Sequence, residues 1–155
     1  MGFCPTINPM YRVIRKLNFC YGHRILGHRG RCGHLHGHNG AVEVELGARK
    51  LDHMGMVADF SEVKRTVQGW IDAELDHRML LSRTDPLARV LKAQGEPVIL
   101  IDGNPTAENL ARLIFDYAAS RGLPVIAVRL WESPDSCAVY SPRPAPKSIG
   151  AGRKR

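Results

Sequence analysis

The sequence lacks several features that would assign it to other classes of protein. It has no run of about 18 apolar residues, the length that a membrane-spanning helix needs, so we expect no transmembrane segment. It does not open on a basic segment followed by an apolar run, and we therefore expect no secretory signal. Its four cysteines include no C-x-x-C pair, which favours free thiols over a disulfide framework. Together these absences predict a soluble, cytoplasmic protein.

The excess of positive charge lies mainly at the C-terminus. The formal net charge is +7, but residues 141–155 hold five Lys and Arg side chains and no acidic one. Without them, 17 basic residues face 15 acidic ones, so the rest of the chain is nearly neutral. We expect an N-terminal arm at 1–9, a single domain at 10–140 and a disordered basic tail at 141–155. The tail could contact RNA or a phosphate surface, although a solubilising role is favoured, and nucleic acid is otherwise not an expected partner.

Alternating apolar and polar residues predict strands near both ends of the domain. Residues 11–19 and 42–46 alternate with a period of two, and we expect them to form a hairpin whose connection carries a Gly- and His-rich segment. Residues 125–132 and 136–140 predict a second pair. The stretch between residues 83 and 103 is ambiguous, and 97–102 could be a further short strand.

Two helices are predicted between these strand pairs. The first begins at Asp59, where Glu62 completes a capping-box pattern. The second has Asn104 as a candidate N-cap, Pro105 in its first turn and Gly122 as its stop signal. The element order is therefore ββααββ. We expect an α+β domain in which two helices cover one face of a four-stranded antiparallel sheet.

The segment "CGHLHGH", residues 32–38, contains one thiol and three imidazoles. On a strand, His34, His36 and His38 would face the same side, and three imidazoles leave an open position on a zinc ion. His23 is a further candidate ligand at the end of the first strand. Cys32 is either a ligand or, beside a metal ion, a thiolate base. Spacing alone leaves open which residues bind, and a surface histidine cluster is the alternative.

Three acidic or basic residues elsewhere suit a reaction site. Asp76 and His77 are adjacent, and a carboxylate that holds an imidazole forms an acid–base unit, although a structural role at a helix end is equally compatible. Glu132 follows Ile126, Val128 and Leu130 on one face of a strand. A partly buried carboxylate there could pair with a heterocycle that carries amide and amine N–H groups. The alternative is a solvated glutamate beyond the end of the strand.

Six short segments together resemble one known family. They are "FCYGHRI", "CGHLHGHN", "GMVADF", "LDHRML", "NPTAENLA" and "LWESPDSCAVY", and they occur in this order between residues 11 and 140. The chain resembles the 6-pyruvoyl-tetrahydropterin synthase / 6-carboxytetrahydropterin synthase family. The resemblance implies the tunnelling fold (T-fold), in which subunits join their sheets around a barrel. It also implies a homo-oligomer, a hexamer made of two trimers.

The resemblance also implies which residues of the histidine-rich segment act. The ligands of a Zn²⁺ cofactor would be His23, His36 and His38. His34 would fall at a variable position and take no part. Cys32 would match the catalytic thiol.

Five other residues match motif positions of the family. Asp76 and His77 match its proton-relay pair, and Glu132 matches the glutamate that anchors the pterin ring. Thr106 and Glu108 match a segment that helps to form the substrate pocket. The chain departs from the family pattern at "FCYGHRI", where Tyr21 stands among positions that usually hold small residues.

The family's substrate is 7,8-dihydroneopterin triphosphate. Three residues separate Cys32 from His36, whereas the pyruvoyl enzymes tend to have a longer insert. This spacing favours 6-carboxy-5,6,7,8-tetrahydropterin synthase, which releases acetaldehyde and triphosphate and feeds 7-deazaguanine (queuosine-type) synthesis. The alternatives are 6-pyruvoyl-tetrahydropterin synthase and a non-catalytic, zinc-containing protein that binds a pterin or purine.

Overall fold

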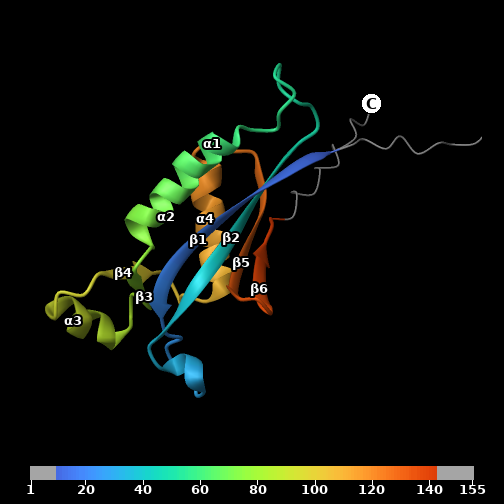
Figure 1. The fold of residues 1–155 in the computed structure, drawn as a ribbon. Coiled ribbons are helices and arrows are strands. Elements are labelled where there is room, and N and C mark those ends of the chain that lie inside the picture. Colours follow the sequence, from blue (N-terminus) through green and yellow to red (C-terminus); the bar gives the residue numbers. More distant parts are fainter. Residues whose placement is uncertain (1–9, 143–155) are drawn as a thin grey trace, which may run out of the picture.

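A six-stranded mixed sheet runs through the computed structural model, with its strands in the order β4-β3-β1-β2-β5-β6 (Figure 1). The structure describes residues 10–142. The predicted arm and all but the first two residues of the predicted tail lie outside that range. The strands are β1 (Tyr11–His23), β2 (His36–Ala48), β3 (Arg78–Ser82), β4 (Val98–Ile101), β5 (Val125–Ser133) and β6 (Ser136–Tyr140).

The predicted hairpin of β1 and β2 is confirmed, but both strands are longer than the sequence indicated. Their antiparallel register runs from Tyr11 opposite Ala48 to His23 opposite His36. The histidines at 23, 36 and 38 therefore lie on paired strands, and the connection holds only the rest of the His-rich segment, including a single 3-10 turn, η1 (Arg31–Gly33). This extension gives three histidines the fixed geometry of a sheet.

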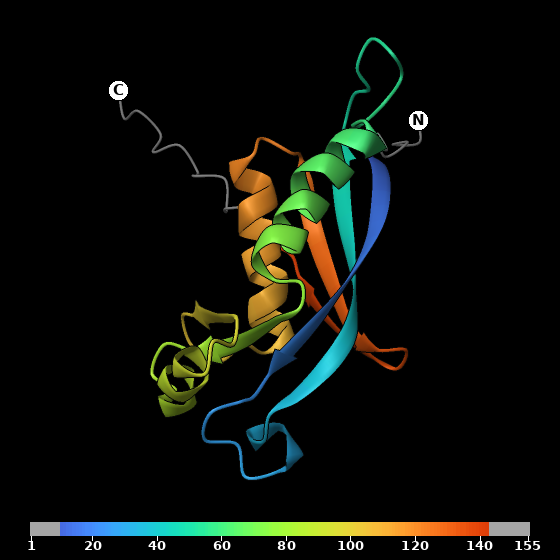
Figure 2. The same ribbon diagram turned by 60° about the vertical axis from the view of Figure 1, so that its left-hand side comes forward.

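Two helical segments cover one face of the sheet, as predicted (Figures 1 and 2). A continuous helical segment consists of α1 (Phe60–Val63), the π-helical turn η2 (Lys64–Gln68) and α2 (Gly69–Glu74), and α4 (Ala107–Ser120) lies beside it. Asp59 caps the first segment by accepting a hydrogen bond from the Ser61 N–H. The helices and strands share one apolar core, whose fully buried members include Val67, Ile71, Ile114, Val42 and Leu130.

The prediction of a four-stranded antiparallel sheet in ββααββ order is wrong. β3 and β4 add two strands, with β3 parallel to β1 and β4 parallel to β3. Their sequences, RMLLS and VILI, are short apolar runs without alternation. Such runs are typical of parallel strands buried on both faces, and periodicity alone cannot separate them from helix. The suggested short strand within residues 97–102 is confirmed as β4.

A third helix covers the opposite face at this end of the sheet. In α3 (Pro86–Ala93), Ala88 packs with Leu81 of β3 and Val98 of β4 in a second, smaller core. Leu80 belongs to the main core, so neighbouring residues of β3 face opposite sides. The expectation that helices cover only one face is therefore wrong for β3 and β4.

The start of α4 differs from the predicted one. Thr106, not Asn104, is the N-cap, and its hydroxyl accepts a hydrogen bond from the Asn109 N–H at 3.3 Å. The Asn104 amide instead pairs with both backbone groups of Leu26, which fastens the segment after β1 to the segment before α4. Gly122 follows the helix with φ of +80°, as its predicted role as stop signal requires. Within residues 10–142, no helix is long and apolar enough to cross a membrane.

Candidate metal centre and active site

Three histidines from β1 and β2 meet at one point. His23 is directly opposite His36 in the strand register, and His38 lies two residues further along the same face of β2. One ligand nitrogen from each lies within 4.8 Å of the others, which is close enough for a single metal ion. His34 precedes β2, is exposed and is not part of this group. We call His23, His36 and His38 the histidine triad.

Hydrogen bonds at Nδ1 fix the tautomers of two triad members, His23 and His36. The Nδ1 atom of His23 lies 2.7 Å from the Pro105 carbonyl oxygen, and Nδ1 of His36 lies 2.8 Å from that of His34. Because a carbonyl oxygen only accepts, both Nδ1 atoms carry hydrogen and both Nε2 atoms present lone pairs. The Nε2 atoms of His23 and His38 are buried without a hydrogen-bond partner. These orphaned nitrogens fit a bound metal ion.

The protonation of His23 also suits a ligand. Burial lowers the pKa of His23, although the hydrogen bond to Pro105 and the nearby carboxylate of Glu132 act in the opposite direction. A neutral imidazole is the form that binds a metal ion. A set of imidazole nitrogens suits zinc, copper, iron or nickel, so the triad supports a metal site and the choice of zinc stays a prediction.

Glu132 reaches the triad from β5. Its Oε1 atom lies 3.8 Å from Nε2 of His23 and 4.0 Å from Nε2 of His38, and it accepts a hydrogen bond from the Tyr21 hydroxyl at 3.0 Å. Its side chain is 25% exposed, so Glu132 is a half-buried group beside the triad and not a solvated residue beyond the strand. Burial and then the Glu132 charge raise the pKa of Tyr21 far above its usual value, so the phenol remains a donor.

Asp76 and His77 form a hydrogen-bonded pair next to β1. The Oδ2 atom of Asp76 lies 2.7 Å from Nδ1 of His77, and Oδ1 accepts from the Cys20 backbone N–H at 2.7 Å. The His77 N–H in turn donates to the Cys20 carbonyl at 2.6 Å. Burial raises the pKa of Asp76, but the hydrogen bonds from Cys20 and His77 outweigh it and hold that pKa below its usual value. The carboxylate therefore stays ionised and holds the imidazole in one tautomer.

The backbone of His77 adopts an unusual conformation. Its φ is +54°, in the left-handed region that residues other than glycine rarely occupy. The hydrogen bonds that both Asp76 and His77 make with Cys20 maintain this conformation. As a result, the Asp76–His77 pair, which we call the dyad, has a fixed position at the start of β3.

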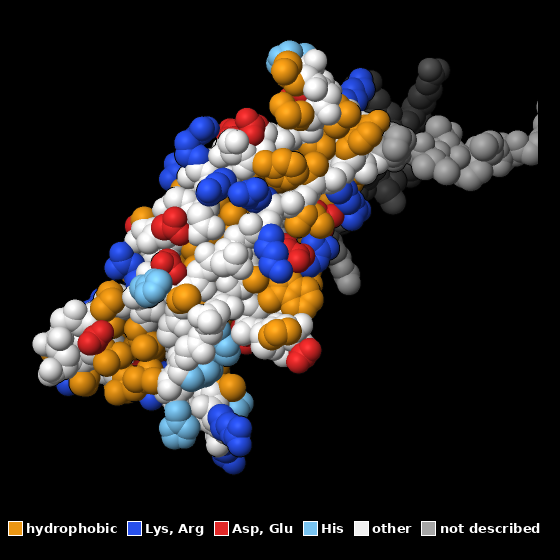
Figure 3. All heavy atoms as spheres, in the orientation of Figure 1, with side chains coloured by type: hydrophobic (Ala, Val, Ile, Leu, Met, Phe, Trp, Pro, Cys, Tyr) orange, Lys and Arg blue, Asp and Glu red, His pale blue; other side chains and the backbone are white. Residues whose placement is uncertain are grey.

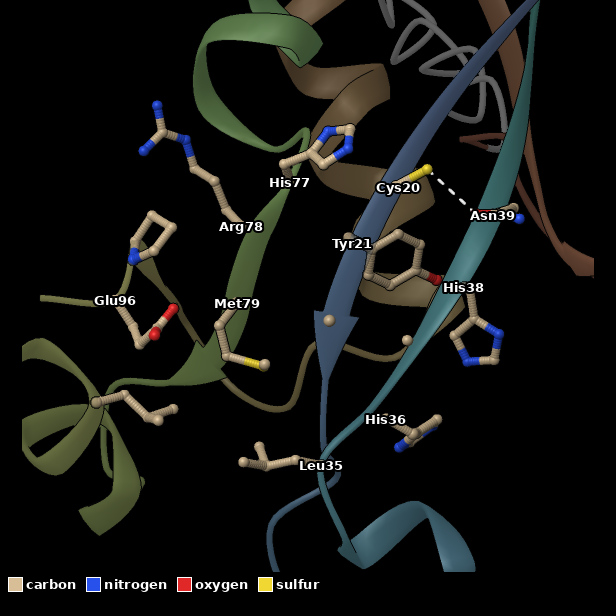
Figure 4. Close-up of a pocket in the computed structure, with 14 residues that line it drawn as sticks. Cys20, Tyr21, Leu35, His36, His38, Asn39, His77, Arg78, Met79 and Glu96 are labelled. Carbon is tan, nitrogen blue, oxygen red and sulfur yellow. Dashed lines mark hydrogen bonds between the residues drawn. The ribbon is translucent and has the colours of Figure 1, made fainter. Parts of the chain in front are cut away.

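One open cavity is bordered both by His77 of the dyad and by two members of the triad. It has a volume of about 640 Å³ and is lined by His77, His36 and His38 together with Cys20 and Asn39 (Figure 4). The space-filling view shows histidine side chains gathered at this end of the molecule, next to an apolar surface over α3 (Figure 3). A second cavity of about 670 Å³ is lined by both His38 and Glu132. His38 therefore borders both cavities.

The predicted site residues Cys32, Thr106 and Glu108 are not among those that line the 640 Å³ cavity. Cys32 is exposed in the turn η1 and lines neither of the two large cavities. The Thr106 hydroxyl is engaged in capping α4. Glu108 lies in the first turn of α4 and shares a small cavity of about 160 Å³ with Glu132. The functional roles of these residues stay predictions.

Sequence reasoning missed Cys20 and Asn39, which are among the polar residues that line the 640 Å³ cavity. The Cys20 thiol donates a hydrogen bond to Oδ1 of Asn39 at 3.1 Å, across the paired strands (Figure 4). Both residues lie on the face of the sheet opposite the main core. No local pattern marks them, because only the register of β1 against β2 brings them together.

Comparison with known proteins places this geometry in a family. A sequence model of the 6-pyruvoyl tetrahydropterin synthase family matches residues 12–143. The chain belongs to this family. Two curated members of the tetrahydropterin synthase family illustrate the similarity. The 6-carboxy-5,6,7,8-tetrahydropterin synthase of Rickettsia bellii is 38% identical over 104 residues, which cover 66% of this chain and 75% of that protein. The enzyme of the same name from Haemophilus influenzae is 31% identical over 143 residues, covering 84% and 99%.

Solved structures of tetrahydropterin synthases and related proteins share the fold. An uncharacterized protein from Wolinella succinogenes has a TM-score of 0.72 and 25% identity, with 87% of this chain and 99% of that chain covered. The 6-pyruvoyl tetrahydropterin synthase of Caenorhabditis elegans has a TM-score of 0.65 and 23% identity, with 87% and 97% covered. The architecture is consistent with the expected tunnelling fold. The predicted family is thus confirmed, and the chain is an enzyme of the tetrahydropterin synthase type.

Proposed function

We propose that this protein is a zinc-dependent 6-carboxy-5,6,7,8-tetrahydropterin synthase. The main support is the histidine triad, with two orphaned Nε2 atoms, in a chain that is 38% identical to a curated protein of that name. The substrate is 7,8-dihydroneopterin triphosphate. The reaction consumes water and yields 6-carboxytetrahydropterin, acetaldehyde and triphosphate, and its product serves 7-deazaguanine synthesis.

His23, His36 and His38 would hold the ion. Zinc bound there would supply a Lewis acid that lowers the pKa of the substrate hydroxyl groups. The hydrogen bonds from the outer ring nitrogens to Pro105 and His34 keep two of the rings oriented for this task. The protein thereby orients the ligands before the ion or the substrate arrives.

His77 is the proposed proton carrier. Asp76 holds the Nδ1 hydrogen of His77, so Nε2 has a free lone pair that can take a proton from the substrate and later return it. His77 lines the cavity that also contains His36 and His38. This shared cavity gives the imidazole access to a substrate that reaches the triad.

Cys32 is the proposed second base. As a thiolate it would take a proton from the substrate side chain, a role that suits a thiol near a dication. In the isolated chain, Cys32 is exposed in η1. We propose that the homo-oligomer, expected to be a hexamer of two trimers, completes the surroundings of this turn.

Glu132 is the proposed anchor for the heterocycle. Its carboxylate borders a cavity of about 670 Å³ and can accept from the amide and amine N–H groups of a pterin. We propose that Thr106 and Glu108 help to form the substrate pocket. For Glu108, the small cavity that it shares with Glu132 supports this assignment.

A 6-pyruvoyl-tetrahydropterin synthase is the second candidate. The description of the matching family and the name of the structurally similar C. elegans protein favour it. It would use the same residues but eliminate triphosphate without breaking a carbon–carbon bond. A pterin-binding protein without catalysis is the remaining alternative, and nothing in the site specifically favours it.

Product analysis separates these functions. Zinc-loaded protein would be incubated with 7,8-dihydroneopterin triphosphate, and the products would be identified by mass spectrometry. We expect 6-carboxytetrahydropterin together with equimolar acetaldehyde. A pyruvoyl product without acetaldehyde would assign the second candidate. No turnover with one zinc bound per chain would contradict both enzymatic proposals.

A further inference from the structure

Tyr21 is a large aromatic residue beside the histidine triad. It lies on β1 two residues before His23, on the same face, and directly opposite His38 of the triad. Its side chain is buried, and its ring stacks on Phe19 with a centroid distance of 4.9 Å. A residue of this size therefore has a defined place next to the metal centre (Figure 4).

The space for this ring comes from Gly40 on β2. A Cβ atom at Gly40 would lie 3.1 Å from Cε1 of Tyr21 and 3.2 Å from Cε1 of Phe19, which is closer than ordinary packing. The two rings thus lie over a part of β2 that has no side chain. Tyr21 can cross β2 at this point because nothing larger than hydrogen stands in its way.

Glu132 lies on β5, on the other side of β2 from Tyr21. Ala41 pairs with Trp131 of β5, so the next residue, Glu132, lies beside Gly40. The Tyr21 hydroxyl, having crossed β2, donates to Glu132 Oε1 at 3.0 Å. Tyr21 and Glu132 are therefore joined across three neighbouring strands, with the triad at their side.

We propose that Tyr21 is a positioning residue that fixes the Glu132 carboxylate to receive the heterocycle of the substrate. The hydroxyl uses one lone pair of Oε1 and leaves the other acceptor sites of the carboxylate for the ligand's N–H donors. A carboxylate held in this way loses less rotational freedom when it binds a ligand. This inference rests on the proposed pterin substrate and deepens it.

The principal test is Tyr21→Phe, which keeps the ring over Gly40 and removes only the hydroxyl. The matched control is Tyr117→Phe on α4, where the ring stacks on Trp70 of α2 and lines neither of the two large cavities. Each protein would be loaded with zinc. The readouts are KM and kcat with 7,8-dihydroneopterin triphosphate, the Kd of the fluorescent pterin neopterin, the zinc content and Tm.

We expect Tyr21→Phe to raise KM and the neopterin Kd about tenfold, the size of one hydrogen bond to a charged group. The kcat value, zinc content and Tm should stay close to those of the wild type, and Tyr117→Phe should change none of these quantities. Adding Tyr21→Phe to Glu132→Gln should cause little further loss, because residues that act as one unit are not additive. A merely structural role would instead lower Tm and leave the ratio of KM to kcat unchanged.

A second variant keeps the inference testable if Tyr21→Phe does not fold. Gly40→Ala retains the hydroxyl but places a methyl group against the ring, so it should also weaken neopterin binding. Unchanged neopterin Kd values in the folded variants, or no neopterin binding by the wild type, would overturn the inference. Absence of turnover with intact, Tyr21-dependent neopterin binding would contradict the proposed reaction while supporting the role of Tyr21.

Discussion

The imidazole of His23 donates its Nδ1 hydrogen to the carbonyl oxygen of Pro105 over 2.7 Å. This bond joins the last residue of β1 to the segment that leads into α4. It turns the Nε2 lone pair of His23 toward His36 and His38 before any ion is present. The orientation of this proposed metal ligand therefore depends on a main-chain group 82 residues away in the sequence.

The first prediction concerns which histidines bind metal. We expect His36→Ala to reduce metal affinity by more than about 100-fold, because a ligand contributes more than the outer contacts that orient it. His34→Ala is the matched control, since His34 supplies only its carbonyl oxygen to Nδ1 of His36. Metal content after dialysis would be measured by elemental analysis. Equal loss in both variants would contradict the triad.

The second prediction concerns the thiol. We expect Cys32→Ala to lower turnover about 10²–10⁴-fold, as for the loss of a general base, while metal content and fold are retained. Cys137→Ala, an exposed thiol on β6, serves as the control and should keep full activity. If Cys32→Ala loses its metal instead, Cys32 is a ligand and its assignment as a base is wrong.

The third prediction concerns the dyad. We expect Asp76→Asn to lower kcat about 10²–10⁴-fold, because an amide no longer holds the Nδ1 hydrogen of His77 and the imidazole loses its fixed tautomer. Circular dichroism and metal content should match the wild type, since Asn can still accept from the Cys20 N–H. Wild-type kcat in this variant would show that His77 acts without Asp76 or does not act at all.

The fourth prediction concerns a buried ion pair near the site. Arg24 follows His23, and its Nε donates to Asp85 Oδ2 at 2.7 Å, while its second donor reaches Oδ1. The Asp85 side chain is fully buried, and it also caps α3. Asp85→Asn keeps the cap but leaves the charge of Arg24 unpaired, and should lower the free energy of unfolding by about 3–5 kcal/mol. Chemical denaturation would measure this change.

The matched control is an exposed ion pair. Asp102 pairs with Arg83 at the surface, where both side chains are more than half exposed. Asp102→Asn should therefore cost less than about 1 kcal/mol. Similar losses in Asp85→Asn and Asp102→Asn would show that burial does not strengthen the inner pair.

The pH dependence of the Asp85 variant has a defined sign. The hydrogen bonds from Arg24 lower the pKa of Asp85 below its value in the unfolded chain, which is about 3.9. Its contribution to stability is therefore complete above that value and is lost as the pH falls through the lowered pKa of the folded state. Wild-type stability should decline more steeply than that of Asp85→Asn below about pH 4. Parallel curves from pH 2 to pH 7 would contradict this account.

The sequence predicted the antiparallel part of the fold because alternation and helical spacing are local signals. β1, β2, β5, β6 and α4 all carry such patterns. β3 and β4 do not, because they are short apolar runs buried on both faces. α3 was missed for a related reason, since its small core forms only against those two strands.

In the candidate site, too, local patterns predicted some features and long-range contacts determined the others. Regular alternation favoured His34 as strongly as His36 and His38. His23 was a further candidate from its place at a strand end, and only the resemblance favoured it over His34. The structure explains this choice, because β1 extends far enough to place His23 opposite His36. Asn104 had the residue type of a helix cap, but its amide is engaged with Leu26 across 78 residues of sequence. Such long-range pairings leave no local signal.

The backbone contacts of Cys20 limit where residues can be inserted into or deleted from this protein. It binds both members of the dyad, and His23 follows it by three residues on the same strand. The spacing between the proposed proton carrier and the candidate metal centre is thus set by about 10 Å of extended chain. Surface loops could be lengthened or shortened without altering it. One residue inserted between Cys20 and His23 would turn that histidine to the other face of the sheet, so this short stretch does not tolerate insertion or deletion.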